Sequence, residues 1–169
     1  MLFIKIVLFL FIFLASTGVG ILLSRKYVNR VKELQEFKSM LNILKTKIRF
    51  TYEPLGEIFK EIANNFSNNV SNILKQVSKN MQINSAENAW KLAIQTENTS
   101  ILKEDKEVLL TLGKLLGKTD LEGQVSQIEQ TSEFLEGQIV KAEIERDKNE
   151  KLYKTLGMVI GAGLVILLI

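Results

Sequence analysis

Residues 31–48 read VKELQEFKSMLNILKTKI, and the spacing of the apolar side chains in this stretch decides the fold class. The apolar residues recur every three or four positions, at Val31, Leu34, Phe37, Leu41, Leu44 and Ile48. Such spacing places them on one narrow face of an α-helix. The other faces are basic, because residues 24–50 hold eight Lys and Arg against two Glu, a net charge of +6. The helix should end before Pro54, since the residue that precedes a proline avoids the helical conformation.

Helical periodicity continues after Pro54, and no stretch of the sequence shows the period-2 alternation that would predict a β-strand. Apolar stripes predict a second helix over residues 55–66 and a short third helix over residues 70–77. A long sixth helix should begin after Asp120, whose carboxylate can cap it. Its apolar seam is expected at Leu121, Val125, Ile128, Ser132, Leu135, Ile139 and Ala142. Residues 121–154 hold eight acidic against five basic side chains, a net charge of −3, so antiparallel packing on the basic helix would pair opposite charges.

Two helices are predicted between the third and the sixth. Asn84 and Ser85 can each cap the fourth helix, and Glu87 lies in capping-box register after Asn84. Trp90 in this helix is expected in the core rather than at a ligand site. The fifth helix has two acidic residues near its start, which its positive end favours, and should end at Gly117. The predicted fold is therefore an all-α, compact antiparallel bundle of about six helices, with hydrophobic membrane helices at both termini.

Both ends of the chain are apolar. Residues 6–23 carry no charge, and 18 helical residues span about 27 Å, close to the roughly 30 Å of a hydrocarbon core. A cleaved signal peptide is the alternative, but the apolar run continues to Leu23 and stops at positive charge, which favours an uncleaved anchor. The second run, residues 156–169, spans only about 21 Å. We predict a transmembrane helix over residues 2–23, a helical-bundle domain over residues 24–154 and a hydrophobic membrane segment over residues 155–169.

Basic residues flank both apolar segments on the side of the bundle domain. They are Arg25, Lys26, Arg30 and Lys32 after the first segment, and Arg146, Lys148, Lys151 and Lys154 before the second. Only Lys5 lies on the other side of the first segment. Because positive charges near membrane segments favour the cytoplasmic side, the bundle domain should face the cytoplasm of a bacterial cell.

Gly157 and Gly161 are spaced four residues apart in the second apolar run, with Gly163 nearby. Glycines at this spacing lie on one helix face and let a second helix approach closely. The first apolar segment, which carries Gly18 and Gly20, is the expected partner. The alternative is that these glycines reflect only the general frequency of glycine in membrane helices.

The composition excludes several classes of chemistry. The chain has no His and no Cys, which removes Ser-His and Cys-His catalysis, disulfides and the usual zinc ligands. The net charge of +3 does not indicate nucleic-acid binding. Residues 113–119, GKLLGKT, have three residues between the glycines where a nucleotide-binding P-loop has four. We therefore predict no catalytic residue, no metal site and no cofactor.

Several segments together resemble the stage III sporulation protein AB family of endospore-forming bacteria. They are the N-terminal anchor, IRFTYEPL at residues 48–55, Ala89-Trp90, EVLLTLGKLLGKTD at residues 107–120, and the long acidic helix with its hydrophobic tail. The resemblance covers essentially the whole chain in order. It implies a six-helix bundle similar to the cytoplasmic F domain of type II secretion and type IV pilus platform proteins.

The resemblance also implies a function. The family belongs to a channel complex that joins mother cell and forespore and is required for endospore formation. In that case the protein is a non-catalytic platform in the mother-cell-derived membrane around the forespore. Its partners are the lipid bilayer and other channel subunits, including a secretion-type ATPase, and self-association into a homo-oligomer is left open.

Two surfaces are predicted to contact partners. One is the basic face of the first helix at Lys38, Lys45, Lys47 and Arg49; the other is the turn that contains Gly117, Lys118 and Asp120. The alternative for the basic face is that it only solubilises an exposed helix. Two other functions are weighed: a secretion or pilus platform outside sporulation, and a membrane-anchored helical signal transducer. The transducer lacks an external sensing segment, since five residues precede the first apolar run.

Overall fold

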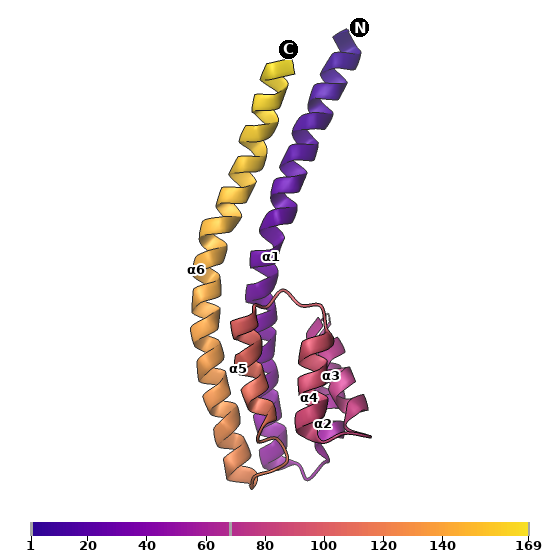
Figure 1. The fold of residues 1–169 in the computed structure, drawn as a ribbon, viewed down its shortest axis with the longest axis vertical. Coiled ribbons are helices and arrows are strands. Elements are labelled where there is room, and N and C mark those ends of the chain that lie inside the picture. Colours follow the sequence, from indigo (N-terminus) through magenta and orange to yellow (C-terminus); the bar gives the residue numbers. More distant parts are fainter. Residues whose placement is uncertain (1, 68, 169) are drawn as a thin grey trace. The chain divides into compact units, whose positions relative to one another are not determined.

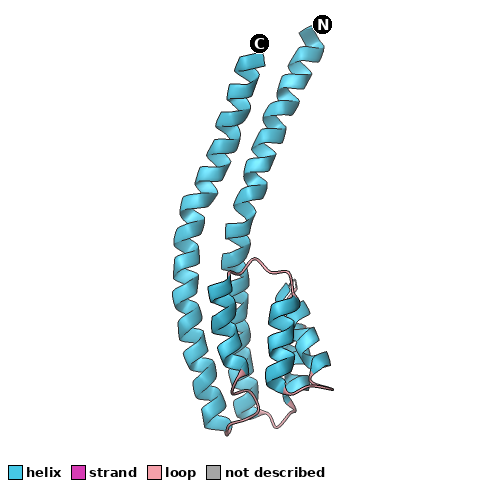
Figure 2. Ribbon diagram, in the orientation of Figure 1, coloured by secondary structure: helices cyan, strands magenta, loops and turns pink. Residues whose placement is uncertain are grey.

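The computed structural model describes residues 2–67 and 69–168. Every regular element in this part of the chain is an α-helix (Figure 2). In order the helices are α1 (Leu2–Phe50), α2 (Leu55–Ala63), α3 (Asn69–Asn80), α4 (Ala86–Thr96), α5 (Lys103–Gly113) and α6 (Leu121–Leu168). The predicted all-α class is confirmed, with six helices among the described residues.

The chain forms two compact units. The central unit comprises residues 32–140, and the terminal unit comprises residues 1–31 together with residues 141–169. Each of the long helices α1 and α6 has one part in the terminal unit and the other part in the central unit. These divisions follow packing within the protein; the membrane boundaries expected at residues 23 and 155 stay predictions.

In the central unit, α2 packs on α3, α3 on α4 and α4 on α5 (Figure 1). The predicted apolar seam of α1 is fully buried at Leu34, Phe37, Leu41 and Leu44, and Met40 joins it. On α6 the buried residues of this unit are Val125, Ile128, Thr131, Leu135 and Ile139. The seam of α6 thus passes through Thr131 rather than the predicted Ser132, which is only partly buried.

Local sequence signals explain where most helices begin and end. The helix α1 ends at Phe50, and Pro54 immediately precedes α2, as its fixed φ permits. The Asp120 carboxylate accepts a hydrogen bond from the Gly123 N–H at 2.9 Å, so the predicted cap of α6 is confirmed. Ser85 caps α4, with its hydroxyl oxygen accepting from the Asn88 N–H at 3.3 Å.

Three predicted helix boundaries differ from the structure. The helix α2 ends at Ala63, three residues before the predicted end at residue 66, because the chain turns at Asn64 and Asn65. Asn84 does not cap α4; its amide instead donates to the Asn80 carbonyl at 3.3 Å, so no capping box forms with Glu87. The helix α5 ends at Gly113 rather than Gly117. Gly117 has a φ of +70°, a left-handed conformation that glycine adopts without strain, and it belongs to the turn that follows α5.

Trp90 lies at the centre of the core, as predicted. Its side chain is fully buried, its indole N–H donates to the Leu109 carbonyl at 2.7 Å, and its ring centroid lies 5.6 Å from that of Phe59. Gly113 is packed directly against the indole, because a Cβ there would lie 2.6 Å from Trp90 Cδ1. Trp90 therefore joins α2, α4 and α5 into one core.

In the terminal unit, the first part of α1 and the last part of α6 lie side by side and antiparallel (Figure 1). The Ser16 hydroxyl donates to the Gly157 carbonyl at 2.8 Å. Tyr27 and Tyr153 stack with ring centroids 5.9 Å apart. Among the described residues, α1 and α6 are the two helices that are long and apolar enough to cross a membrane.

Candidate functional site

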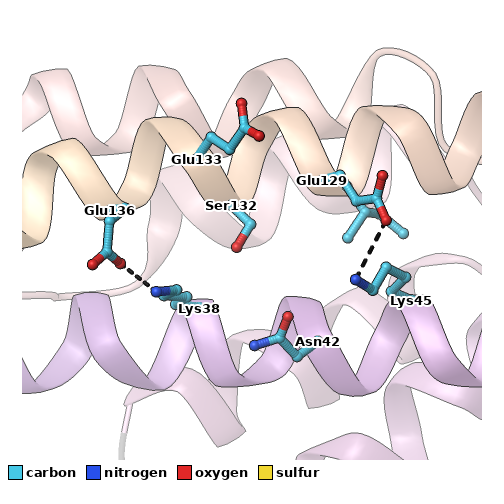
Figure 3. Close-up of a pocket in the computed structure, with 8 residues that line it drawn as sticks. Lys38, Asn42, Lys45, Glu129, Ser132, Glu133 and Glu136 are labelled. Atoms are coloured by element: carbon cyan, nitrogen blue, oxygen red, sulfur yellow. Dashed lines mark hydrogen bonds and ion pairs between the residues drawn. The ribbon is translucent and has the colours of Figure 1, made fainter.

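The predicted basic face of α1 is paired with acidic side chains of the central unit. Lys38 forms an ion pair with Glu136, and Lys45 Nζ lies 3.4 Å from Glu129 Oε1 (Figure 3). Between the two pairs lies an open groove of about 370 Å³, also lined by Asn42, Ile128, Ser132 and Glu133. Opposite charges do therefore lie alongside the apolar seams of α1 and α6, as the sequence predicts. The exposure of these pairs means that the buried apolar seams dominate the stability of this contact.

Lys47 is also paired within the central unit. Its ammonium donates to Glu61 and lies 3.8 Å from Glu53. The hydrogen bond to Glu61 raises the pKa of Lys47, assisted by the negative charges of both carboxylates and opposed by partial desolvation. Of the four basic residues predicted to contact partners on α1, three thus have acidic neighbours in the same chain. Arg49 is exposed on the last turn of α1.

An exposed aromatic edge begins at Arg49, and its two aromatic residues were not predicted from the sequence as a partner surface. The Phe50 side chain is 74% exposed and Tyr52 is fully exposed. We call Arg49, Phe50 and Tyr52 the aromatic edge of the central unit. Its residues fall after the helical seam and before Pro54, outside any periodic pattern. The available signal was two large aromatic side chains shortly before Pro54, beyond the last position of the predicted seam at Ile48.

The turn after α5 lies next to the start of α2. A Cβ on Gly117 would lie 3.4 Å from Leu55 Cδ1, so this turn and the beginning of α2 are neighbours. The Gly117 N–H donates to Gln124 Oε1 at 3.2 Å, and Lys118 pairs with Glu87. With Asp120 capping α6, all three residues predicted here as a partner surface take part in holding the turn. Their contact with a partner stays a prediction.

The Glu87–Lys118 pair gives a pH-dependent prediction. The hydrogen bond from Lys118 lowers the pKa of Glu87 below its usual 4.5, and the positive charges of Lys118, Lys91 and Lys114 add to this. A lowered pKa stabilises the fold above the unfolded-state pKa, and this stabilisation disappears as the pH falls through the folded-state pKa. Glu87→Gln should therefore lower the thermal midpoint of the full chain slightly at pH 7 and leave it unchanged at pH 2–3, as circular dichroism can measure. In a Lys118→Met background, an undiminished effect of Glu87→Gln at pH 7 would contradict this assignment.

A buried carboxylate organises one edge of the central unit. Glu33 is 6% exposed and accepts hydrogen bonds from Asn69 Nδ2 and from the Ser100 N–H, both at 2.9 Å. It thereby ties the start of α3 and the connection between α4 and α5 to α1. Sequence reasoning counted Glu33 only as one of two acids on a basic helix. These hydrogen bonds give it a structural role, because both of its oxygens are engaged with the protein.

The glycine-rich segment at residues 113–119 has no phosphate-binding geometry. Gly113 is the last residue of α5 and is covered by the Trp90 ring, while Gly117 lies in the following turn. A phosphate-binding loop instead follows a strand and opens a helix with free backbone N–H groups. Among the described residues, no three His, Cys, Asp or Glu side chains are grouped so that they could hold a metal ion.

In the terminal unit, glycines bring α1 and α6 into close contact. A Cβ on Gly157 would lie 2.9 Å from the Ser16 carbonyl oxygen and 3.1 Å from Gly20 Cα, and one on Gly161 would lie 3.2 Å from Phe13 Cδ2. The predicted partner Gly18 has open space instead. The geometry is that of a close glycine-mediated crossing, and its importance in a bilayer stays a prediction.

Some of the basic residues that flank the apolar segments form ion pairs within the chain. Arg30 is buried and its guanidinium donates to Glu145 Oε2 at 2.7 Å within the terminal unit. Lys154 donates to Glu150 one helical turn earlier, at 2.6 Å. Its ammonium is thus directed along α6 towards residues that precede the apolar run, which is the direction a snorkelling lysine would take.

Comparisons of the sequence and of the structure with known proteins point to the same family. The sequence model of the family described as stage III sporulation protein AB matches residues 5–169. Stage III sporulation protein AB of Bacillus subtilis (strain 168) is 28% identical over 162 residues, covering 94% of this chain and 95% of the relative. A solved structure of a stage III sporulation protein AB superposes with a TM-score of 0.67 and 24% identity, covering 71% of this chain and 98% of that chain. The chain therefore belongs to the stage III sporulation protein AB family.

Proposed function

We propose that this protein is a non-catalytic membrane platform of the channel complex between mother cell and forespore. Its two apolar helical segments anchor it in the mother-cell-derived membrane, and its central unit faces the mother-cell cytoplasm. There it binds other subunits of the complex, including a secretion-type ATPase. The family membership supports a role in sporulation, and the family is named for that process rather than for an enzyme.

One observation carries the platform proposal. The first part of α1 and the last part of α6 lie side by side, with both chain ends at the same end of the terminal unit (Figure 1). Two antiparallel apolar segments with basic residues at the same end favour a single orientation, in which residues 24–154 stay on the cytoplasmic side. A domain held in this way acts through the surface that it presents to partners.

The aromatic edge is the part of that surface best suited to a partner. Tyr, Phe and Arg are enriched in protein interfaces, with Tyr and Arg frequent among the residues that contribute most binding energy, whereas Lys is depleted. Phe50 and Tyr52 are exposed beside Arg49, while Lys38, Lys45 and Lys47 already contact acids of the same chain. We therefore propose that the ATPase or another cytoplasmic subunit docks at the aromatic edge.

The experiment is copurification of the tagged full-length chain from sporulating cells, combined with a count of heat-resistant spores. Phe50→Ala with Tyr52→Ala should reduce recovery of the cytoplasmic partner strongly and lower spore yield. A truncation at an interface hot spot costs about 2 kcal/mol, roughly thirtyfold in Kd. Ile83→Ala is the matched control, because Ile83 is also 85% exposed in the central unit but lies outside the aromatic edge.

Two outcomes would contradict different parts of the proposal, namely the role in sporulation and the docking surface. Normal spore yield in cells that lack the protein would contradict its role in the sporulation channel. Normal recovery of the ATPase with the Phe50/Tyr52 double variant would contradict the docking surface alone. The predicted basic face is tested in the same assay by reversing the charges of Lys45, Lys47 and Arg49, and unchanged recovery would identify it as a solubilising face.

A further inference from the structure

The terminal unit contains an apolar groove between its two helices. The groove has a volume of about 610 Å³ and is lined by both α1 and α6. Phe11, Ala15 and Val19 form part of one wall, and Ile160 forms part of the other. The Ser16 hydroxyl also lines it but is already engaged with the Gly157 carbonyl at 2.8 Å. Such walls suit a hydrocarbon chain rather than a polar ligand.

One end of the groove carries an aromatic and cationic cluster. Tyr153 lines the groove, and its ring stacks on Tyr27 with centroids 5.9 Å apart. Lys26 and Tyr27 follow the groove residue Leu23 by three and four positions, so they continue the same helix face by one turn. The Lys26 ammonium lies 4.9 Å from the Tyr27 ring centroid and 5.9 Å from that of Tyr153. Tyrosine and lysine at the end of an apolar segment are typical of the bilayer interface.

The Lys26 ammonium at this end forms no ion pair with a carboxylate among the described residues. Lys154, by contrast, donates to Glu150, and Arg30 donates to Glu145. The neighbours of the Lys26 ammonium are instead the rings of Tyr27 and Tyr153. An unpaired ammonium beside an apolar groove complements an anion that is joined to a hydrocarbon chain.

We propose that this groove binds one anionic phospholipid of the bilayer, with an acyl chain along the groove and the phosphate at Lys26. The inference rests on the membrane placement given under the proposed function. A helix from a second copy is the competing occupant. In a parallel arrangement a second copy would bring its own Lys26 to the same end, and the like charges would oppose the contact. The observed charge therefore favours a lipid.

The test uses the full-length chain purified in detergent and native mass spectrometry with two lipids of identical acyl chains. Phosphatidylglycerol should bind more tightly than phosphatidylcholine. Lys26→Gln should reduce this preference about fivefold, the ratio that one basic residue provides at an anionic membrane surface, and should leave phosphatidylcholine binding unchanged. Lys148→Gln is the control with the same loss of charge, since Lys148 is exposed on α6 and does not line the groove.

A second pair of variants tests the groove itself. Ala15→Phe should fill it and reduce binding of both lipids, because Ala15 is exposed on the groove wall and has room for the larger side chain. Leu14→Phe adds a comparable ring outside the groove and should leave binding unchanged. Equal preference for phosphatidylglycerol in wild type and Lys26→Gln, or undiminished lipid binding by Ala15→Phe, would overturn the inference. A lipid-free dimer that Ala15→Phe disrupts would also overturn it, in favour of a second copy.

Membrane retention separates this inference from the proposed function. The wild-type chain, Lys26→Gln and Ala15→Phe should all resist extraction from membranes by alkaline carbonate. If they do and the lipid preference is absent, the lipid site alone is wrong. If carbonate extracts the wild-type chain, the membrane placement is wrong and the lipid site is wrong with it.

Discussion

Trp90→Ala should destabilise the central unit by about 3–5 kcal/mol, the range for removing a large buried aromatic side chain. Trp90 is fully buried, and its loss would also leave the Leu109 carbonyl without its indole donor. A domain of this size has about 5–15 kcal/mol of total stability, so the variant should lose a large part of it. The measurement is urea unfolding of the full chain in detergent followed by circular dichroism, because Trp90 is the chain's one tryptophan and its fluorescence disappears with it.

Gly113 supplies the control for this prediction. Gly113→Ala should cost about 1–3 kcal/mol, because the new Cβ would lie 2.6 Å from Trp90 Cδ1. In the Trp90→Ala background the clash is absent, so Gly113→Ala should cost little or even stabilise α5 through its higher helix propensity. Additive effects of the two substitutions would contradict the direct packing of Gly113 on Trp90.

Gly157→Leu should separate the two helices of the terminal unit. A Cβ at this position meets the Ser16 carbonyl oxygen at 2.9 Å and Gly20 Cα at 3.1 Å. These are backbone atoms, so no side-chain rotation relieves the clash. Overpacking of roughly 1–3 kcal/mol would lower the equilibrium constant for helix pairing by about five- to 160-fold.

The pairing can be followed by cross-linking, because the chain has no native cysteine. Cysteines that replace Tyr27 and Tyr153, whose rings stack in the terminal unit, should be joined readily by a short bismaleimide in membranes. Gly157→Leu should reduce this cross-link, and Gly163→Leu should not, because a Cβ at Gly163 meets open space. Equal cross-linking in the two leucine variants would contradict the glycine contact.

The helices were predictable because burial on one face leaves a periodic trace in the sequence. Leu34, Phe37 and Leu44 lie in the core where the spacing placed them. On α6 the next buried residue after Ile128 is Thr131, three positions later. The spacing of the apolar residues had instead placed Ser132, four positions later, in the seam. Because both side chains are short and polar, hydropathy does not indicate which of the two neighbouring positions is buried. The Thr131 hydroxyl donates to the Gln127 carbonyl in its own helix at 2.8 Å, so its polar group has a partner in the buried position.

The surface features depended on contacts between residues distant in sequence. The usual preference for glycine after a helix predicted that α5 ends at Gly117. The helix instead ends at Gly113, which packs against Trp90. No periodic pattern reveals that Glu33 binds both Asn69 and the Ser100 backbone. The pairing of Lys38 with Glu136 joins residues 98 positions apart. The opposite net charges of the two long helices predict such pairing in general, but the individual partners follow only from the register of α1 against α6 in the fold.

The topology of the chain in a membrane is the most direct test of a platform held at both ends. Single cysteines would replace Phe3 and Leu167, which lie at the outer ends of the two predicted membrane segments, and Ile83, which is 85% exposed in the central unit. Each variant would be treated with a membrane-impermeant maleimide in intact vegetative cells that express the full chain. We expect labelling at positions 3 and 167 from outside, and labelling at position 83 only after permeabilisation. Labelling of position 83 in intact cells would place the central unit outside the cytoplasm and contradict the account.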